Sequence, residues 1–278
     1  MNRKSLICFL TVNPGKLFYQ FVKQIPNPER IYICIDRSNH EIPGYQNEIK
    51  LIKVDKTKCE QKGFKNTHSK IRGAISREKA LYYFCTHDID FDHIWFIEDD
   101  VFIPNITTID YLDNKYPRGD LLCQENFVVN TKSDVEKSDW PMWDNYSIKT
   151  KYPLPWAKSM ICAIRCSKKL LDCIQDYANK YGELFMCEIL FNTTALHNNL
   201  SVLPIDELSG IKWRIKWRGN WRKRDIKTNY LYHPVKSIPE QYKLRSRGSH
   251  DPKTLNTALI LGIICGISLI IISLILSF

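Results

Sequence analysis

The 278-residue sequence lacks several features that would point to particular protein classes. It has no CxxC pair, and Cys162 and Cys166 have no histidines at zinc-site spacing, which argues against a structural zinc. It shows no internal repeat and, apart from its C-terminal tail, no low-complexity stretch, which argues against a repeat array. The basic N-terminus leads into a short apolar run with no small-residue cleavage site after it, so we expect no signal peptide.

The ten cysteines do not follow the pattern of a secreted, disulfide-linked protein. Several lie inside apolar runs, where cysteine behaves as a small hydrophobic residue: Cys8, Cys34, Cys85, Cys162 and Cys265. Together with the expected absence of a signal peptide, this predicts reduced thiols in the cytosol.

Length and charge set broad limits. A chain of this length with 44% hydrophobic residues can bury a full core and fits one large domain or two closely packed halves. The net charge of +10 is compatible with a nucleic-acid partner, an anionic membrane surface or a phosphate-bearing substrate. Charge alone does not choose among these partners.

Residues 258–278 (ALILGIICGISLIIISLILSF) form an uncharged run. At about 1.5 Å per residue a helix of this length crosses a hydrocarbon core of about 30 Å, so we predict a transmembrane helix rather than a buried core helix. The basic residues before it, Lys243, Arg245, Arg247 and Lys253, agree with a cytosolic approach to the membrane. The expected organisation is a domain at 1–240, a basic juxtamembrane linker at 241–257 and a C-terminal tail anchor at 258–278.

The first half of the chain alternates buried strands with amphipathic helices. Apolar runs at 6–12, 30–35 and 49–54 predict strands, and residues 17–25 and 69–86 carry apolar side chains at helical spacing, with Ile71, Ala74, Ile75, Leu81 and Phe84 as the inner face of the second helix. This alternation predicts an α/β fold with a mainly parallel sheet flanked by helices.

The second half continues the α/β pattern. Residues 93–103 predict a buried strand interrupted by acids, with Asn105 as the cap of a short helix that runs to residue 116. A strand at 160–164, a helix capped by Ser167 that runs to about residue 180, a helix at 184–197 and a strand at 201–205 follow.

Three adjacent acids, Glu98, Asp99 and Asp100, stand where the strand at 93–103 is interrupted. Adjacent carboxylates repel one another unless a cation or several donors compensate them, and Mg²⁺ or Mn²⁺ is the simplest compensation. An exposed acidic turn is the alternative, but apolar residues on both sides favour a buried setting. A carboxylate cluster at a strand end is suited to a nucleotide diphosphate with its metal ion.

The segment FIEDDVFIP resembles the acidic metal motif (DxD and its EDD variant) of glycosyltransferases with the GT-A fold. The resemblance spans roughly residues 5–236, although only the acidic motif is specific, and the chain is most similar to viral and protist members. It implies a GT-A-like, Rossmann-like domain that uses Mn²⁺ or Mg²⁺ and a nucleotide sugar, most simply a uridine diphosphate sugar. The acceptor would be a glycan, a protein or a lipid near the membrane.

Metal and phosphate roles follow from this resemblance. Asp100 would bind the metal, and Glu98 and Asp99 would contact its waters, the ribose or the sugar. His233 would bind the metal or the diphosphate, and Lys236 would add positive charge beside the phosphates. A histidine in a proline turn, without any such role, is an equal alternative for His233.

The nucleotide would lie against three residues at strand ends. The resemblance places Asp36 against the uridine or ribose, and Thr11 and Asn13 in the lining of the nucleotide pocket. Polar residues follow strands in any α/β protein, so a purely structural role for each remains an equal alternative.

Sugar transfer by inversion needs a carboxylate that takes the proton of the acceptor hydroxyl. Glu188 is the first candidate for this base because it stands alone on an otherwise apolar helix, where burial would raise its pKa. Glu183, at the start of the helix, is the competing candidate, although helix N-termini favour acids for electrostatic reasons alone.

Tryptophans form two groups. Residues 213–224 (WRIKWRGNWRKR) interleave aromatic and basic side chains, which we assign to a membrane surface or a diphosphate in preference to nucleic acid. Tryptophans that fix a loop to the core are the alternative. Trp140, Trp143 and Trp156 are candidates for an acceptor groove because sugar faces stack on aromatic rings. Two other classes remain: a tail-anchored interaction protein with an inactive transferase-like domain, and a metal-dependent nuclease or phosphotransferase.

Overall fold

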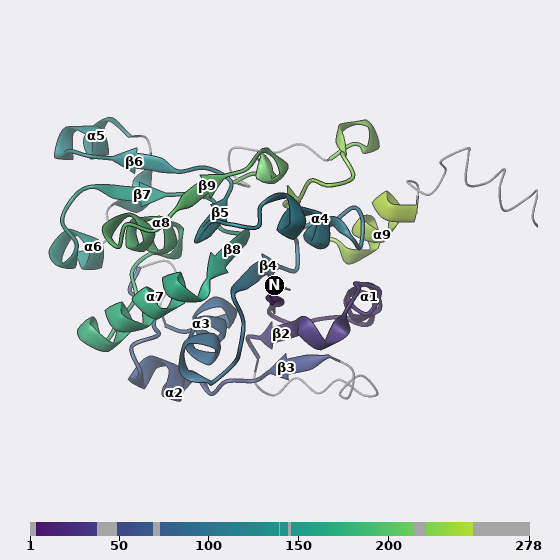
Figure 1. The fold of residues 1–278 in the computed structure, drawn as a ribbon, viewed down its shortest axis with the longest axis horizontal. Coiled ribbons are helices and arrows are strands. Elements are labelled where there is room, and N and C mark those ends of the chain that lie inside the picture. Colours follow the sequence, from purple (N-terminus) through teal and green to yellow (C-terminus); the bar gives the residue numbers. More distant parts are fainter. Residues whose placement is uncertain are drawn as a thin grey trace, which may run out of the picture.

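A seven-stranded sheet forms the centre of the molecule in the computed structural model (Figure 1), which describes residues 4–37, 49–68, 73–138, 140–143, 146–213 and 221–246. In spatial order its strands are β3 (Lys50–Ile52), β2 (Ile31–Ile35), β1 (Ser5–Thr11), β4 (His93–Glu98), β8 (Ala163–Ser167), β5 (Leu121–Cys123) and β9 (Val202–Pro204). The neighbouring strands pair in parallel except at β8, which runs antiparallel to both β4 and β5. The predicted α/β class with a mainly parallel sheet is confirmed.

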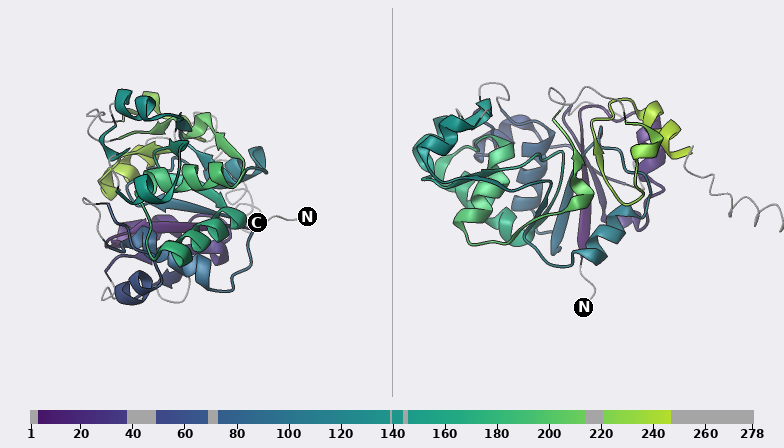
Figure 2. Two further views of the ribbon diagram at one scale, coloured as in Figure 1. Left: turned by 90° about the vertical axis from the view of Figure 1, so that its left-hand side faces the viewer. Right: turned by 90° about the horizontal axis from the view of Figure 1, so that it is seen from above.

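Helices cover both faces of the sheet (Figures 1 and 2). One face packs against α2 (Lys56–Gln61), α3 (Ser76–Thr86), α7 (Lys168–Tyr181) and α8 (Cys187–His197). The other packs against α1 (Lys16–Val22), α4 (Thr108–Lys115) and α9 (Ile238–Ser246). Alternate residues of β1 enter the two cores, Cys8 on one side and Phe9 on the other. Burial on both faces explains why this strand is a continuous apolar run.

Smaller elements extend beyond the central sheet. Two ribbons pair β6 (Phe127–Val129) with β7 (Trp156–Lys158) and β10 (Gly210–Ile211) with β11 (Tyr232–His233). The remaining helices are α5 (Lys132–Lys137), α6 (Tyr146–Lys151) and the 3₁₀ turns η1 (Pro28–Arg30), η2 (Pro141–Trp143), η3 (Asp206–Leu208) and η4 (Lys223–Asp225). None of these short elements has enough apolar periodicity to be predicted from the sequence.

Several predicted boundaries are wrong. The helix expected at 69–86 begins at Ser76, and Ile75, assigned to its inner face, is 37% exposed because its extended backbone precedes the helix. The strand expected at 93–103 ends at Glu98, where a turn begins. Thr107, not Asn105, occupies the N-cap position of α4, although the Asn105 side chain accepts a hydrogen bond from the Thr107 amide.

Two further elements are shifted along the chain. The strand predicted at 160–164 lies at Ala163–Ser167 as β8, and the helix predicted at 184–197 begins at Cys187 as α8. The predicted cap of α7 is confirmed, because the Ser167 side chain accepts a hydrogen bond from the Leu170 amide.

The C-terminal helix α9 is part of the folded domain. It crosses the expected boundary between residues 240 and 241, and its Gln241 is 2% exposed. Tyr242 donates a hydrogen bond to the Leu17 carbonyl, and the Arg245 guanidinium lies over the Phe21 ring at 3.5 Å. The packed unit therefore continues to Arg245.

The predicted transmembrane helix at 258–278 and most of the linker lie outside the described residues. Within the part of the chain that the structure describes, no helix has both the length and the apolar character of a membrane span.

The loop after α2 packs tightly against the end of α7 through Gly63, which has a φ of +82°. A methyl group added there would meet the Ala178 carbonyl oxygen at 2.4 Å, whereas one added at Gly182, with φ +69°, would meet no atom within 4 Å. We expect Gly182→Ala to lower the free energy of unfolding by about 1 kcal/mol through backbone strain alone. Gly63→Ala should lower it clearly more, because the added methyl group also meets the Ala178 carbonyl oxygen. Urea denaturation of the two variants measures the difference. Equal costs would contradict the packing described for Gly63.

Candidate functional site

The carboxyl ends of three neighbouring parallel strands carry the polar residues that the sequence singled out. β1 ends at Thr11, and Asp36 and Glu98 stand at the ends of β2 and β4. The Asp36 amide donates to the Thr11 carbonyl at 2.9 Å, and the Asp99 amide donates to the Leu10 carbonyl at 3.0 Å. These bonds hold the strand exits side by side, at the sheet edge where ligands of open α/β folds bind.

Each acid of the triplet has its own compensating partner. Glu98 accepts a 2.6 Å hydrogen bond from the Arg77 guanidinium, and Asp99 accepts one of 2.5 Å from the Thr11 hydroxyl. Asp100 is only 7% exposed and forms an ion pair with Lys236. The triplet is therefore a set of individually held carboxylates, and the alternative of an exposed acidic turn is wrong.

Arg77 is a site residue that the sequence analysis missed. It lies in the first turn of α3, its side chain is 4% exposed, and one of its terminal nitrogens, NH1, is buried without a hydrogen-bond partner. Because Arg77 binds only the Oε1 atom of Glu98, the Oε2 atom is left to face His233, at 3.9 Å from Nε2. Arg77 thus orients Glu98 and keeps one donor group available inside the site.

His233 is oriented in the way that metal-binding histidines are. Its Nδ1 lies 2.8 Å from the Lys212 carbonyl oxygen, so a proton on Nδ1 makes this bond and leaves Nε2 as the acceptor. Nε2 lies 3.4 Å from Asp100 Oδ1. Asp100 Oδ1 is itself buried without a hydrogen-bond partner. An imidazole nitrogen and an unsatisfied carboxylate oxygen that face each other fit a divalent cation between them.

A thiol joins these ligands. Single atoms of Glu98, Cys162 and His233 lie within 4.8 Å of one another. Cys162 is placed there because β8 runs antiparallel beside β4, and the Glu98 amide donates to the Cys162 carbonyl at 2.8 Å. Sequence spacing gave no sign of this group, since its three members come from distant parts of the chain.

Burial and neighbouring charges separate the pKa values of the site. Burial raises the pKa of Asp99, and the charges of Asp100 and Glu98 raise it further. Burial would also raise the pKa of Asp100, but contact with His233 and Lys236 outweighs burial, so that this pKa is lowered. Burial would lower the pKa of His233, but Asp100 and Glu98 outweigh burial and raise it. The negative charge of Asp100 and Glu98 that raises the pKa of His233 would also attract a cation to this position.

The two candidate bases occupy different surroundings. Glu188 lies in the first turn of α8, and burial raises its pKa. The charge of Arg77 lowers this pKa and the charge of Glu98 raises it, so Glu188 interacts electrostatically with residues of the acid cluster. Glu183 forms an ion pair with Lys151 of α6. Of the two, Glu188 is the one that the fold brings toward the triplet.

The three predicted nucleotide residues are placed unequally. Thr11 is buried and bonded to Asp99, and Asp36 lies 3.4 Å from the Lys79 ammonium, a cation that the sequence analysis also missed. Asn13 is exposed in the loop after β1. Thr11 and Asp36 therefore belong to the sheet edge that carries the acids.

The predicted acceptor-groove role is wrong for two of the three tryptophans. Trp143 and Trp156 are 2% and 7% exposed and stack on each other, with their indole nitrogens bonded to Ser138 and to the Tyr152 carbonyl. Their rings fill the core and have no free face for a sugar. Residues 214–220 of the second tryptophan group lie outside the described residues, and Trp221 packs against Tyr232 at 4.8 Å.

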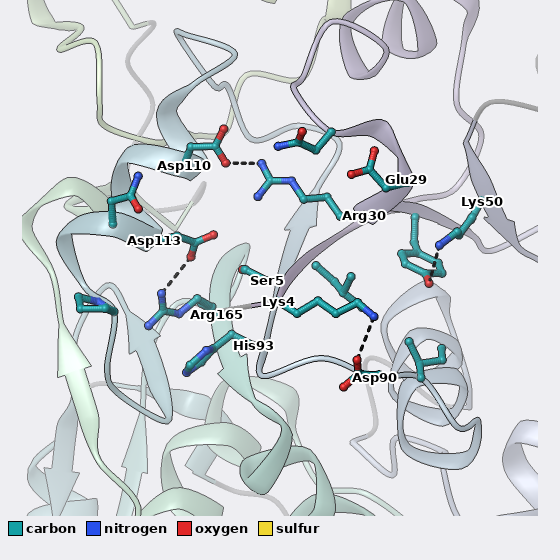
Figure 3. A pocket seen from close by; sticks show the side chains of 16 residues that line it. Lys4, Ser5, Glu29, Arg30, Lys50, Asp90, His93, Asp110, Asp113 and Arg165 are labelled. Carbon is teal, nitrogen blue, oxygen red and sulfur yellow. Dashed lines mark hydrogen bonds and ion pairs between the residues drawn. The ribbon is translucent and has the colours of Figure 1, made fainter. Parts of the chain in front are cut away.

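Figure 3 shows a pocket of about 900 Å³ that is lined by Ser5 and His93, the first residues of β1 and β4. Glu98 stands at the other end of β4. The lining of the pocket also includes three ion pairs: Lys4 with Asp90, Arg30 with Asp110, and Arg165 with Asp113. A pocket of this volume could hold a ligand. The acid cluster is the better candidate because its unsatisfied oxygen and imidazole converge at the ligand-binding edge of the sheet.

Comparisons with known proteins give a weak likeness. No protein-family model matches the chain, and a search of curated proteins finds no match. Among solved structures, an active-site mutant of LgtC matches with a TM-score of 0.42 and 11% identity. The galactosyltransferase LgtC in complex with donor and acceptor sugar analogs matches with a TM-score of 0.43 and 12% identity. Each match covers 87% of this chain and 95% of the other. Likeness at this level carries no argument about activity, which has to be inferred from the site itself.

The contact of His233 with Asp100 should make stability depend on pH when no metal is bound. Because the folded-state pKa of His233 is raised, its contribution is complete below 6.5, the ordinary value, and is lost as the pH rises through the folded pKa. Because the pKa of Asp100 is lowered, its contribution is present above 3.8 and is lost on acidification. In a chelator, the difference in Tm between wild type and His233→Gln should be largest between pH 3.8 and 6.5. A difference that does not change with pH would contradict this contact.

Proposed function

We propose that this chain is a metal-dependent glycosyltransferase that moves a sugar from a nucleotide diphosphate donor to a glycan, protein or lipid acceptor. One observation carries the proposal: Asp100 Oδ1, buried and unsatisfied, faces the Nε2 atom of His233 at the carboxyl edge of a parallel sheet. Such a pair suits a divalent cation that also binds a diphosphate. The EDD resemblance to glycosyltransferases with the GT-A fold, which includes the same Asp100, supports this proposal.

Asp100, His233 and the free Oε2 atom of Glu98 are the proposed metal ligands. Carboxylate oxygens suit both Mg²⁺ and Mn²⁺, and the imidazole favours Mn²⁺ because Mg²⁺ prefers oxygen ligands. A divalent cation held there would neutralise the negative charge that develops on the diphosphate as the sugar leaves. Lys236, whose side chain is 57% exposed, is free to turn from Asp100 toward a phosphate.

The nucleotide is proposed to lie along the ends of β1 and β2. Asp36 and the loop that holds Asn13 flank this edge, while Thr11 keeps Asp99 in place through its hydroxyl. Asp99, held by the Thr11 hydroxyl, is proposed to accept hydrogen bonds from ribose or sugar hydroxyls. The unpartnered NH1 of Arg77 is a further donor to a sugar or phosphate oxygen.

Glu188 is the proposed proton acceptor for the acceptor hydroxyl. Burial raises the pKa of Glu188, which is the direction that strengthens a general base, and the positive charge of Arg77 acts against this rise. Glu183 is not proposed for this role because its carboxylate pairs with Lys151.

Membrane attachment through residues 258–278, with the catalytic domain on the cytosolic side, stays a proposal that rests on the sequence alone. A lipid-linked acceptor, or a glycan or protein acceptor held near the bilayer, would fit that arrangement. Nucleic acid is not a proposed partner.

Replacing the central ligand tests the metal site. With the full chain in detergent, Mn²⁺ and a uridine diphosphate sugar should together raise the Tm of the wild type, because a bound ligand stabilises the folded state. In Asp100→Asn this joint shift and the metal-dependent turnover should disappear. The matched control is Asp90→Asn, because the Asp90 side chain is 92% exposed at the far end of the sheet. This variant should leave the Tm shift and the turnover unchanged.

A full Tm shift in Asp100→Asn would exclude the proposed site. No shift in the wild type would favour the inactive, transferase-like interaction protein.

Replacing the proposed base should separate chemistry from binding. Glu188→Gln should lower kcat for transfer by about 10²-fold or more, the usual contribution of a general base, while the joint Tm shift with Mn²⁺ and donor remains. Glu183→Gln should retain kcat. If Glu188→Gln transfers sugar at the wild-type rate, Glu188 is not the base.

A further inference from the structure

We propose that Cys162 is a ligand of the metal site, so that the site binds thiophilic divalent ions such as Co²⁺ and Zn²⁺ in preference to Mg²⁺. This inference deepens the proposed function and rests on its claim that a divalent cation binds beside Glu98 and His233. It adds a thiolate to a ligand set that would otherwise consist of carboxylates and one imidazole.

Geometry brings the thiol to the site. Cys162 immediately precedes β8, beside Glu98, and their backbones are joined by the 2.8 Å bond from the Glu98 amide to the Cys162 carbonyl. The Cys162 sulfur lies within 4.8 Å of both a Glu98 oxygen and a His233 nitrogen. Metal bonds of about 2.0–2.3 Å place ligand atoms roughly 3–4 Å apart, so side-chain shifts of about 1 Å would close the group around an ion.

Hydrogen bonds from neighbouring residues orient the other two ligands, Glu98 and His233. Arg77 holds Glu98 by one oxygen and leaves the second free, and the Lys212 carbonyl holds the Nδ1 side of the His233 ring and leaves Nε2 free. Such supporting hydrogen bonds are a regular feature of metal-binding histidines and carboxylates. The three ligand atoms come from β4, β11 and the residue before β8, so the fold brings together residues that are far apart in the sequence.

Chemistry then selects the ion. A thiolate with an imidazole and a carboxylate is a ligand set typical of zinc-like ions, whereas Mg²⁺ prefers oxygen ligands alone. Burial raises the pKa of Cys162 well above its ordinary value, so the thiol is neutral until a cation binds. When the metal–sulfur bond forms, the S–H bond breaks and the proton passes to solvent, without any redox change.

Cobalt provides the test because a thiolate bound to Co²⁺ gives a charge-transfer absorption that oxygen and nitrogen ligands do not give. We expect Co²⁺ titrated into chelator-treated full chain to produce this near-ultraviolet band, and a large excess of Mg²⁺ to leave it in place. Cys162→Ser should lose the band and bind Co²⁺ about tenfold or more weakly. Cys166→Ser, a change at a buried cysteine within β8, should keep the band.

The outcomes separate this inference from the proposed function. A band that persists in Cys162→Ser, or Co²⁺ that binds the wild type without any band, would overturn the thiolate ligand while leaving the metal site in place. Co²⁺ binding that is equally unaffected by Cys162→Ser, His233→Gln and Asp100→Asn would overturn both. A metal-free melt of each variant identifies any that fails to fold, and Cys162→Ala replaces Cys162→Ser in that case.

Discussion

Mutual repulsion among Glu98, Asp99 and Asp100 at the end of one buried strand is the constraint around which the described part of the chain is organised. The fold meets it by giving each acid a different partner: Arg77, Thr11 and Lys236. These partners come from α3, from β1 and from the segment after β11. The site can therefore exist only in the folded chain, and the helix α9 strengthens it, because Gln241 donates hydrogen bonds to the carbonyls of Asp99 and Val235.

Two buried polar atoms of the site have no hydrogen-bond partner in the described part of the protein, and this points to a bound ligand. Asp100 Oδ1 and Arg77 NH1 are both buried without hydrogen-bond partners, which is costly unless a ligand supplies them. Asp100 Oδ1 is an acceptor beside an imidazole and suits a cation. Arg77 NH1 is a donor and suits an anion. A divalent ion with a diphosphate sugar would satisfy both at once.

Sequence patterns were sufficient for the parts of the site that depend on local order. Apolar runs predicted the parallel strands, and the resemblance suggested that Thr11 and Asp36 lie near the acids. In the structure the parallel pairing of β1 with β2 and β4 brings Thr11, Asp36 and Glu98 to one edge of the sheet. Partners that depend on distant pairing could not be foreseen. In the sequence, Arg77 cannot be distinguished from other basic residues on helices. Cys162 lies beside Glu98 only because β8 pairs antiparallel with β4, and no residue pattern predicts this pairing. The same limit made two buried tryptophans look like a sugar groove.

Anomalous scattering from crystals of the full chain grown with Mn²⁺ and UDP tests the central claim most directly. We expect one manganese peak bounded by Asp100 Oδ1, Glu98 Oε2 and His233 Nε2, with diphosphate oxygens among its other ligands. A nucleotide bound without manganese at these atoms, or a manganese peak elsewhere on the molecule, would contradict it.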